Sequence, residues 1–395
     1  MADLPPADSP ARRALDWLGS QHDAMLALIG ELVSIDSGSG HDVGVDAVGR
    51  RLERFFLEHD VPVEWHRGED GGDAFSAGAS LAAGLQGHVL LMGHRDTVFP
   101  VGESGRRPFR VENGRAYGPG VADMKPGLVM NAYVIAACQR YAALPFPVCA
   151  LYTTDEEIAS PRSRRVIKRA AGAARVVFNG EPGRANGNVV TGRKGGTFMA
   201  LDIRGRAAHA GANFADGISA IDELAHKIVA LRQITDLERG LTLNVGTVHG
   251  GQTVNTVAPS VRAELDLRYR TQADRAAAMA RIEAIVAGAT IPGTTASLAI
   301  TGEFDSFNSS PASVRLFEHY RQAMADLGVR VEGEFSGGCA DSGITSNLGI
   351  PTLCATGPVG GGYHTDKEFL EIASIVPRTQ GLMLAIARLA GVTGI

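Results

Sequence analysis

The chain has 395 residues, of which 45% are hydrophobic and 21% charged, and its formal net charge is -5 at pH 7. This balance is typical of a globular enzyme with two or three domains, and it argues against nucleic acid or a membrane surface as partner. The first 18 residues contain three prolines and no continuous apolar run. We therefore expect no signal peptide, no membrane-spanning helix and a cytoplasmic location.

The first half of the chain alternates short β-rich runs with longer helical patterns. Such alternation predicts βαβ units, and therefore an α/β fold with a mostly parallel sheet. The predicted strands are 88–92, 148–153 and 176–178, and the predicted helices are 124–140 and 163–173.

After Gly192 the pattern changes to strand, helix, two strands, helix and strand, which predicts a ferredoxin-like unit. Within it, the strand 261–269 alternates apolar and charged residues, so we expect one buried and one solvated face. The six predicted elements are 197–204, 218–231, 241–248, 261–269, 273–288 and 296–301.

A helix over 314–327, a strand over 351–355 and a C-terminal helix then return the chain to the first fold. The sequence thus predicts a discontinuous catalytic domain, 1–193 and 303–395. An inserted lid or dimerisation domain, 194–302, separates its two parts.

Five side chains of metal-binding type each lie in a short loop after an apolar segment: His94, Asp123, Glu157, Glu181 and His364. The carboxyl ends of parallel strands meet at one edge of a sheet, so we expect these loops to converge in one crevice that holds two cations.

Each of these motifs has a simpler reading when it is taken alone. His94 and Asp96 form an H-x-D pair in which the aspartate orients a ligating histidine, but such pairs also occur on ordinary surfaces. Asp123 precedes a helix and could be only its N-cap. The run Asp155 to Glu157 is either solvated or neutralised by cations, and the apolar strand before it favours cations.

Together, the segments G-H-R-D-T-V-F, G-P-G-V-A-D-M-K, T-T-D-E-E, N-G-E-P, G-R-A-A-H-A-G and G-Y-H-T-D-K resemble a known family. It is that of the co-catalytic zinc peptidases and amidohydrolases, typified by glutamate carboxypeptidase, aminoacylase and succinyl-diaminopimelate desuccinylase. The resemblance covers nearly the whole chain.

The resemblance implies two divalent ions per chain, zinc first, with manganese or cobalt as alternatives. Asp123 would bridge them, with His94 and Glu181 on one ion and Glu157 and His364 on the other. The Asp123–Met124 bond would be cis. Such a pair of ions activates a water, and Glu156 would be the general base that takes its proton.

The resemblance further implies that His209 polarises the reacting group and that Asn255 and Arg268 contact a small-molecule substrate. It also implies a homodimer or higher homo-oligomer. From local sequence alone, His209 could be an ordinary loop histidine and Arg268 a solvent-facing residue of its strand.

The leading hypothesis is a metal-dependent hydrolase that cleaves a C–N bond of an acyl-amino-acid-like substrate. The stretch 301–307 lacks the arginine of glutamate-releasing relatives, so we do not expect glutamate as the preferred group. One alternative is a hydrolytic deaminase of an aromatic amine, with Phe304, Phe307 and Tyr363 around a flat ring. A second alternative is a non-catalytic binding protein.

Overall fold

The computed structural model describes residues 4–68, 73–141 and 144–394. Its contacts divide the chain into two compact units. Unit 1 comprises 1–192, 309–336 and 340–395, and unit 2 comprises 193–308 with 337–339. The insertion therefore begins close to the predicted position, but unit 2 extends six residues past 302 and includes a short later loop.

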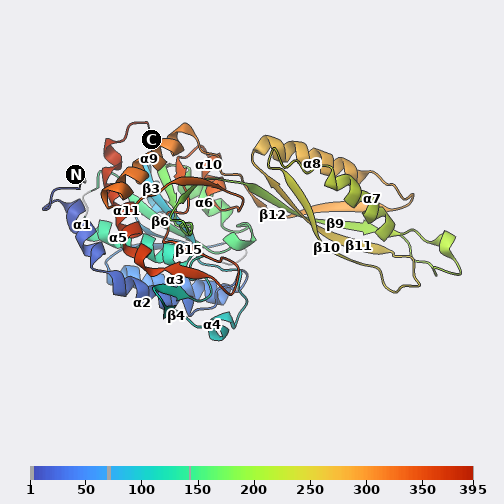
Figure 1. The fold of residues 1–395 in the computed structure, drawn as a ribbon, viewed down its shortest axis with the longest axis horizontal. Helices are drawn as coiled ribbons and strands as arrows, with labels where there is room; N and C mark the ends of the chain where they lie inside the picture. The colour runs from blue at the N-terminus through green and yellow to red at the C-terminus, as the bar shows by residue number, and fades with distance from the viewer. Residues whose placement is uncertain (1–3, 69–72, 142–143, 395) are drawn as a thin grey trace. The chain divides into compact units, whose positions relative to one another are not determined.

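Unit 1 is built on a six-stranded sheet in the order β1-β2-β6-β3-β7-β14 (Figure 1). The neighbours β6, β3, β7 and β14 run parallel, whereas β1 and β2 add an antiparallel edge. The prediction of a mostly parallel sheet is thus confirmed. The strands are β1 (Val63–His66), β2 (Ala74–Gly78), β3 (His88–His94), β6 (Val148–Thr153), β7 (Ala174–Asn179) and β14 (Thr352–Leu353).

Helices cover both faces of this sheet because its central strands are apolar on both sides. On one face, Val89 and Leu91 of β3 pack in a core to which α1, α2, α3, α5, α9 and α11 contribute. On the other face, Leu90 and Met92 pack with α6 and α10. These helices are α1 (Pro10–Gly19), α2 (His22–Val33), α3 (Asp42–Glu58), α5 (Lys125–Tyr141), α6 (Arg164–Ala171), α9 (Pro311–Asp326), α10 (Ser342–Asn347) and α11 (Ile375–Arg388).

Two smaller sheets and a short helix, α4 (Glu103–Arg106), were not predicted from the sequence. Their strands have two to five residues, too few for a clear alternation of apolar and polar positions. One sheet has the order β15-β16-β5-β4 and the other pairs β13 with β8. The strands are β4 (Arg110–Glu112), β5 (Arg115–Tyr117), β8 (Val189–Arg193), β13 (Gly333–Ser336), β15 (Gly360–Gly361) and β16 (Phe369–Glu371).

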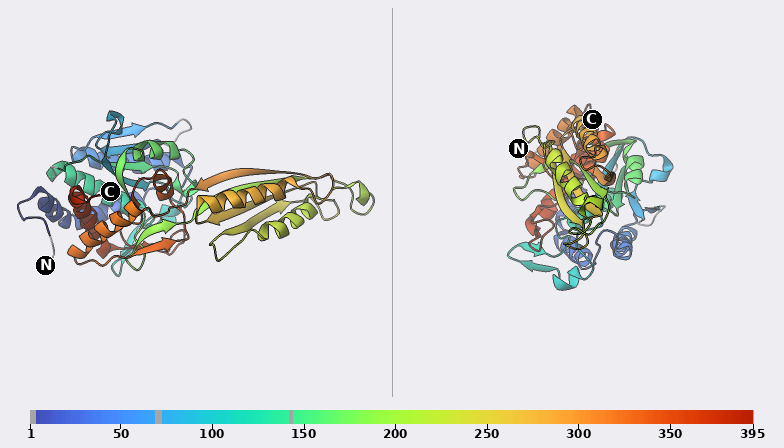
Figure 2. Two further views of the ribbon diagram at one scale, coloured as in Figure 1. Left: turned by 90° about the horizontal axis from the view of Figure 1, so that it is seen from above. Right: turned by 90° about the vertical axis from the view of Figure 1, so that its right-hand side faces the viewer.

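Unit 2 contains an antiparallel sheet in the order β10-β11-β9-β12, with α7 and α8 on one of its faces (Figures 1 and 2). Along β11, Val261, Ala263 and Leu265 are buried with the helices, while Arg262 and Glu264 are exposed. This alternation confirms the predicted one-sided strand. The elements are β9 (Gly195–Arg204), α7 (Ala220–Arg232), β10 (Thr242–Gly250), β11 (Ser260–Tyr269), α8 (Gln272–Ala287) and β12 (Thr295–Phe304).

The close approach of α5 to the loop after β7 gives a test of packing in unit 1. A Cβ on Gly127 would lie 1.9 Å from the carbonyl oxygen of Gly180, whereas a Cβ on Gly105 of α4 would meet no atom within 4 Å. We expect Gly127→Ala to lower the free energy of unfolding by at least about 2 kcal/mol, because backbone must move. Gly105→Ala should leave it unchanged or raise it by about 0.5 kcal/mol. Urea unfolding of both variants measures the difference, and equal stabilities would contradict this packing.

Candidate functional site

The loops that carry three of the five predicted ligands lie at one edge of the six-stranded sheet in unit 1. His94 ends β3, the 3₁₀ turn Glu156–Ile158 follows β6, and Glu181 follows β7. Because β6, β3 and β7 are parallel neighbours, their carboxyl ends lie side by side. Asp123 lies two residues before α5, and His364 lies in the loop between β15 and β16. The expectation that all five loops follow parallel strands is therefore wrong for these two, which follow strands of the smaller antiparallel sheet.

Asp123 directs its two carboxylate oxygens at different histidines. Its Oδ1 lies 3.3 Å from His94 Nε2, and its Oδ2 lies 3.5 Å from His364 Nε2. On one side, Glu181 Oε1 is 3.6 Å from His94 Nε2. On the other, Glu157 Oε2 is 3.3 Å from His364 Nε2. The structure thus brings all five predicted ligands together, with Asp123 between two groups.

Glu156 lies beside the first of these groups. Its Oε2 is 3.9 Å from His94 Nε2, and only 6% of the residue is exposed. Ligand atoms of His94, Glu156 and Glu181 lie within 4.8 Å of one another, as do those of His94, Asp123 and Glu157. Geometry alone therefore allows Glu156 to be either a neighbour or a ligand of a cation.

The donor set fits divalent cations. Among the described residues, His94 Nε2, Asp123 Oδ1 and Glu157 Oε1 are buried and have no hydrogen-bond partner. Buried polar atoms are seldom left in this state, and imidazole with carboxylates is a set that binds zinc, manganese or cobalt. The Asp123–Met124 peptide bond is cis, as the resemblance implied.

The electrostatics of the cluster agree with this fit. Burial, together with the charge of Asp123, raises the pKa of Glu157 to about 7, and burial raises the pKa of Glu156 well above its usual range. Carboxylates that are crowded in this way repel one another. Divalent cations would remove the repulsion and lower both pKa values.

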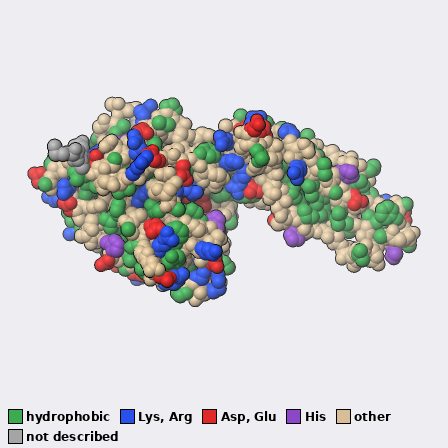
Figure 3. Space-filling view, viewed as in Figure 1, with side chains coloured by type: hydrophobic (Ala, Val, Ile, Leu, Met, Phe, Trp, Pro, Cys, Tyr) green, Lys and Arg blue, Asp and Glu red, His purple; other side chains and the backbone are tan. Residues whose placement is uncertain are grey.

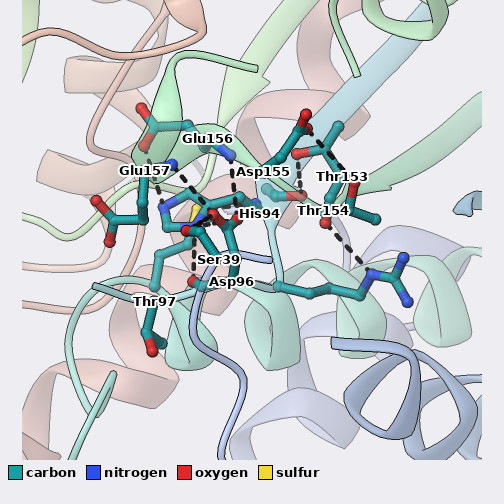
Figure 4. Close-up of polar contacts among 12 residues, drawn as sticks. Ser39, His94, Asp96, Thr97, Thr153, Thr154, Asp155, Glu156 and Glu157 are labelled. Atoms are coloured by element: carbon teal, nitrogen blue, oxygen red, sulfur yellow. Dashed lines mark hydrogen bonds and ion pairs between the residues drawn. The ribbon is translucent and has the colours of Figure 1, made fainter. Parts of the chain in front are cut away.

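Asp96 connects the H-x-D motif to the loop of acids, a role that its sequence spacing did not indicate. Its Oδ1 accepts a hydrogen bond from the Glu156 amide (3.1 Å), and its Oδ2 accepts one from the Glu157 amide (3.1 Å) and one from Ser39 Oγ (2.6 Å) (Figure 4). The carbonyl oxygen of Asp96 lies 3.0 Å from His94 Nδ1, closer than its carboxylate at 3.4 Å. Asp96 therefore orients both the histidine and the acidic loop.

Asp155 has a purely internal role, so the interpretation of the whole acidic run as cation-bound is wrong for this residue. It is fully buried, and its carboxylate accepts hydrogen bonds from the amides of Arg162 (2.7 Å) and Ser163 (3.2 Å). These bonds form the tight loop that presents Glu156 and Glu157 at the sheet edge.

Two further buried acids were missed in the sequence. Glu368 accepts hydrogen bonds from the amides of Gly120 (2.9 Å), Ala122 (2.8 Å) and Asp123 (2.9 Å), and thereby holds the Asp123 loop. Asp341 is 3% exposed and accepts a hydrogen bond from Ser160 Oγ (2.6 Å). An acid in a polar stretch looks solvated from sequence, and no local pattern marks either residue as buried.

The predicted substrate-contacting residues His209, Asn255 and Arg268 belong to unit 2. His209 Nδ1 accepts hydrogen bonds from the amides of Gly211 (3.2 Å) and Ala212 (3.1 Å), so the ring proton lies on Nε2. The backbone carbonyl of Asn255 accepts a hydrogen bond from the backbone amide of Ala210, the residue after His209. Arg268 is partly buried, with its Nε 2.7 Å from Asp266 Oδ1 and its Nη1 2.8 Å from Cys339 Sγ.

Known proteins resemble this chain over most of its length. Carboxypeptidase G2 of Pseudomonas sp. (strain RS-16) is 29% identical over 369 residues, which cover 91% of this chain and 87% of that protein. Acetylornithine deacetylase of Vibrio atlanticus is 29% identical over 255 residues, 60% of this chain and 66% of that protein.

Solved structures share the fold. The M20 family metallo-carboxypeptidase Sso-CP2 of Sulfolobus solfataricus superposes with a TM-score of 0.74 at 18% identity, over 92% of this chain and 98% of that one. The YXEP protein of Bacillus subtilis, described as a dinuclear metal-binding peptidase, superposes with a TM-score of 0.67 at 16% identity, over 95% of this chain and 99% of that one.

Within the part of the chain that the structure describes, no helix is both long and apolar enough to cross a bilayer. The model of the family described as peptidase family M20/M25/M40 matches residues 90–388, which include all five predicted ligands. The chain therefore belongs to peptidase family M20/M25/M40 and is a metal-dependent hydrolase of amide or peptide C–N bonds.

Proposed function

We propose that this enzyme hydrolyses the amide bond of a small acyl-amino-acid-like substrate, with Glu156 as the general base. The observation that carries the proposal is the position of Asp123 between His94 and His364, with the buried Glu156 next to this group. The names of two relatives, a carboxypeptidase and a deacetylase, agree with a substrate of this class.

In this proposal Asp123, His94 and Glu181 would hold one divalent ion, and Asp123, Glu157 and His364 would hold a second. Zinc would be the preferred metal, with manganese or cobalt as alternatives. When bound, the ions lower the pKa of a water and polarise the substrate carbonyl.

Glu156 accepts the proton of the attacking water as its oxygen adds to the carbonyl carbon. It then returns that proton to the amide nitrogen as the C–N bond breaks, so the products are a carboxylic acid and an amine. Its position supports this role, because the Glu156 side chain is buried and its Oε2 lies 3.9 Å from His94 Nε2.

Unit 2 is proposed as a ferredoxin-like lid that supplies His209, Asn255 and Arg268 to the substrate. Support for His209 comes from its tautomer, because the proton on Nε2 can be donated to a carbonyl oxygen. Arg268 has a planar fork suited to a carboxylate, although part of it is already used by Asp266 and Cys339.

Exposed apolar residues on unit 2 support the proposal of a homodimer or higher homo-oligomer. Val229 of α7 is 67% exposed, Val248 of β10 is 49% exposed and Val254 is fully exposed. Acidic and basic side chains are interspersed on the face drawn in Figure 3, as expected for a partner other than nucleic acid. Light scattering on the purified protein tests the oligomeric state.

The cytoplasmic location stays a prediction.

The structure favours the aromatic deaminase alternative less than amide hydrolysis. Phe307 is fully buried and Phe304 is 7% exposed, so neither presents its ring to solvent. The hydroxyl of Tyr363 donates to the carbonyl of Gly360 at 2.8 Å. The non-catalytic alternative is dropped because the chain belongs to a family of hydrolases.

Substituting Glu156 tests the general base. Glu156→Gln keeps the shape of the side chain but cannot accept the proton, so we expect kcat to fall by about 10²- to 10⁴-fold with two ions still bound per chain. Steady-state kinetics and mass-spectrometric ion counts measure both quantities. Glu112→Gln, which alters a largely exposed acid of β4, is the control. Retained turnover would remove the base role, and a lost ion would make Glu156 a ligand.

Removal of the ions tests the bridge. Chelation should destabilise the protein, and zinc at about 100 times its Kd should restore about 2.7 kcal/mol. Asp123→Asn should bind neither ion tightly, because it changes the ligand shared by both groups. Asp23→Asn, at a fully exposed side chain, should respond like the wild type. Thermal denaturation with and without zinc measures the effect, and a full zinc response in Asp123→Asn would refute the bridge.

Glu368 should position the Asp123 loop without touching the ions. Glu368→Ala leaves three buried amides without their acceptor, and we expect zinc affinity to fall about 10- to 100-fold. Glu368→Gln retains one acceptor oxygen, so its zinc affinity should fall less than that of Glu368→Ala. Calorimetric titration of ion-free protein with zinc ranks the variants. Wild-type affinity in Glu368→Ala would show that the loop holds its shape unaided.

A further inference from the structure

Beside the cluster of acids, unit 1 has a recess whose lining is mainly apolar. Its space is about 740 Å³, including the part open to solvent. Glu157, which faces His364 on one side, also lines this recess, so the recess adjoins the candidate metal centre. We name it the 98–101 recess, after the segment that forms one wall; Ser39, His41, Thr97 and Ile158 are among its other lining residues.

Three aliphatic side chains of this recess are exposed to solvent. Val98 is 41% exposed, Val101 is 62% exposed and Ile158 is 46% exposed. Grouped apolar side chains next to a polar catalytic centre are typical of a substrate pocket, in which apolar walls bind and a few polar groups orient.

The recess is formed by backbone that is already held in place. The amide of Thr97 donates to the carbonyl of Ser37 (2.9 Å), and the amide of Ser39 donates to the carbonyl of Thr97 (3.0 Å). A Cβ on Gly38 would lie 2.3 Å from the Phe99 carbonyl oxygen, so glycine is required for this approach.

The other end of the same loop is fixed by Asp36. Its carboxylate accepts hydrogen bonds from the amides of Gly102 (2.7 Å) and Ser104 (2.8 Å). The wall that carries Val98 and Val101 is therefore tied at both ends. A wall fixed before binding costs a ligand little ordering entropy, which suits selection by shape.

Of the four polar side chains that line the recess, those of Ser39 and Thr97 are engaged within the protein, Glu157 faces His364 of the candidate metal centre, and His41 is the fourth. Ser39 Oγ donates to Asp96, and the Thr97 hydroxyl accepts the Phe99 amide at 3.4 Å. The Arg107 guanidinium lies over the Phe99 ring at 4.6 Å. The lining thus offers few partners to a polar group and contact area to an apolar one.

We infer that the 98–101 recess binds an apolar, aliphatic or small aromatic, substituent of the substrate next to the scissile amide. This inference rests on the proposed amide hydrolysis and adds the chemical class of its substrate. It is consistent with the departure of residues 301–307 from glutamate-releasing relatives.

Two series of substrates test the inference in zinc-loaded full-length enzyme. One series lengthens the acyl chain on alanine from acetyl to pentanoyl, and the other lengthens the amino-acid side chain of N-acetyl substrates from alanine to norleucine. We expect kcat/KM to rise about fourfold per methylene in one series, because each buried methylene favours binding by about that factor. The series that rises identifies the side of the amide that enters the recess.

Substitution of the wall assigns the effect to this place. Val101→Ser should flatten the rising series, and Ile158→Ser should do the same with ion content unchanged. Val111→Ser, at a valine of β4 that is 52% exposed, should keep the wild-type slope. If kcat/KM rises with chain length as steeply in Val101→Ser and Ile158→Ser as in the wild type, the inference is overturned.

A binding measurement separates this inference from the proposed function. Calorimetry with straight-chain carboxylates from butanoate to octanoate should show affinity that rises with length in the wild type but not in Val101→Ser. If the enzyme turns over amides but neither kcat/KM nor the affinity for carboxylates changes with chain length, the inference about the recess is overturned and the proposed amide hydrolysis stands. Rising affinities without turnover of any amide would support the recess and count against the proposed function.

Discussion

The two-sided arrangement around Asp123 is the interaction on which the rest of the site depends. Its oxygens lie 3.3 Å from His94 and 3.5 Å from His364, two residues separated by most of the chain. A carboxylate can face two histidines in this way only if the loop that carries it is rigid. Hydrogen bonds from the amides of Ala122 and Asp123 to the Glu368 carboxylate hold this loop in place.

Buried acids in this protein fall into two kinds with different physical roles. Asp96, Asp155 and Glu368 accept hydrogen bonds from backbone amides, and these bonds shape the loops. For Glu368 the amides only partly offset burial, which raises the pKa of its carboxyl to about 7. Glu156 and Glu157 lack such compensation at their carboxylates, and their pKa values are raised by burial. The first kind shapes the loops, and the second kind supplies carboxylates to the candidate metal centre.

The same loops serve the metal centre and the apolar recess. The loop after β3 begins with His94 and Asp96 and continues into Val98 and Val101. The loop after β6 presents Glu157 to the centre and Ile158 to the recess. Neighbouring residues of two loops thus line both the candidate metal centre and the 98–101 recess.

The sequence by itself determined the mostly parallel sheet, and it predicted an inserted unit and five candidate ligands that the structure brings together. It did so because apolar runs that end in His or acidic residues can be read locally, and parallel strands bring their ends together. It could not separate Asp155 from Glu156 and Glu157, or reveal Glu368 and Asp341. Only the tertiary structure decided which acid meets a backbone amide and which meets a histidine, because those contacts join residues far apart in the chain.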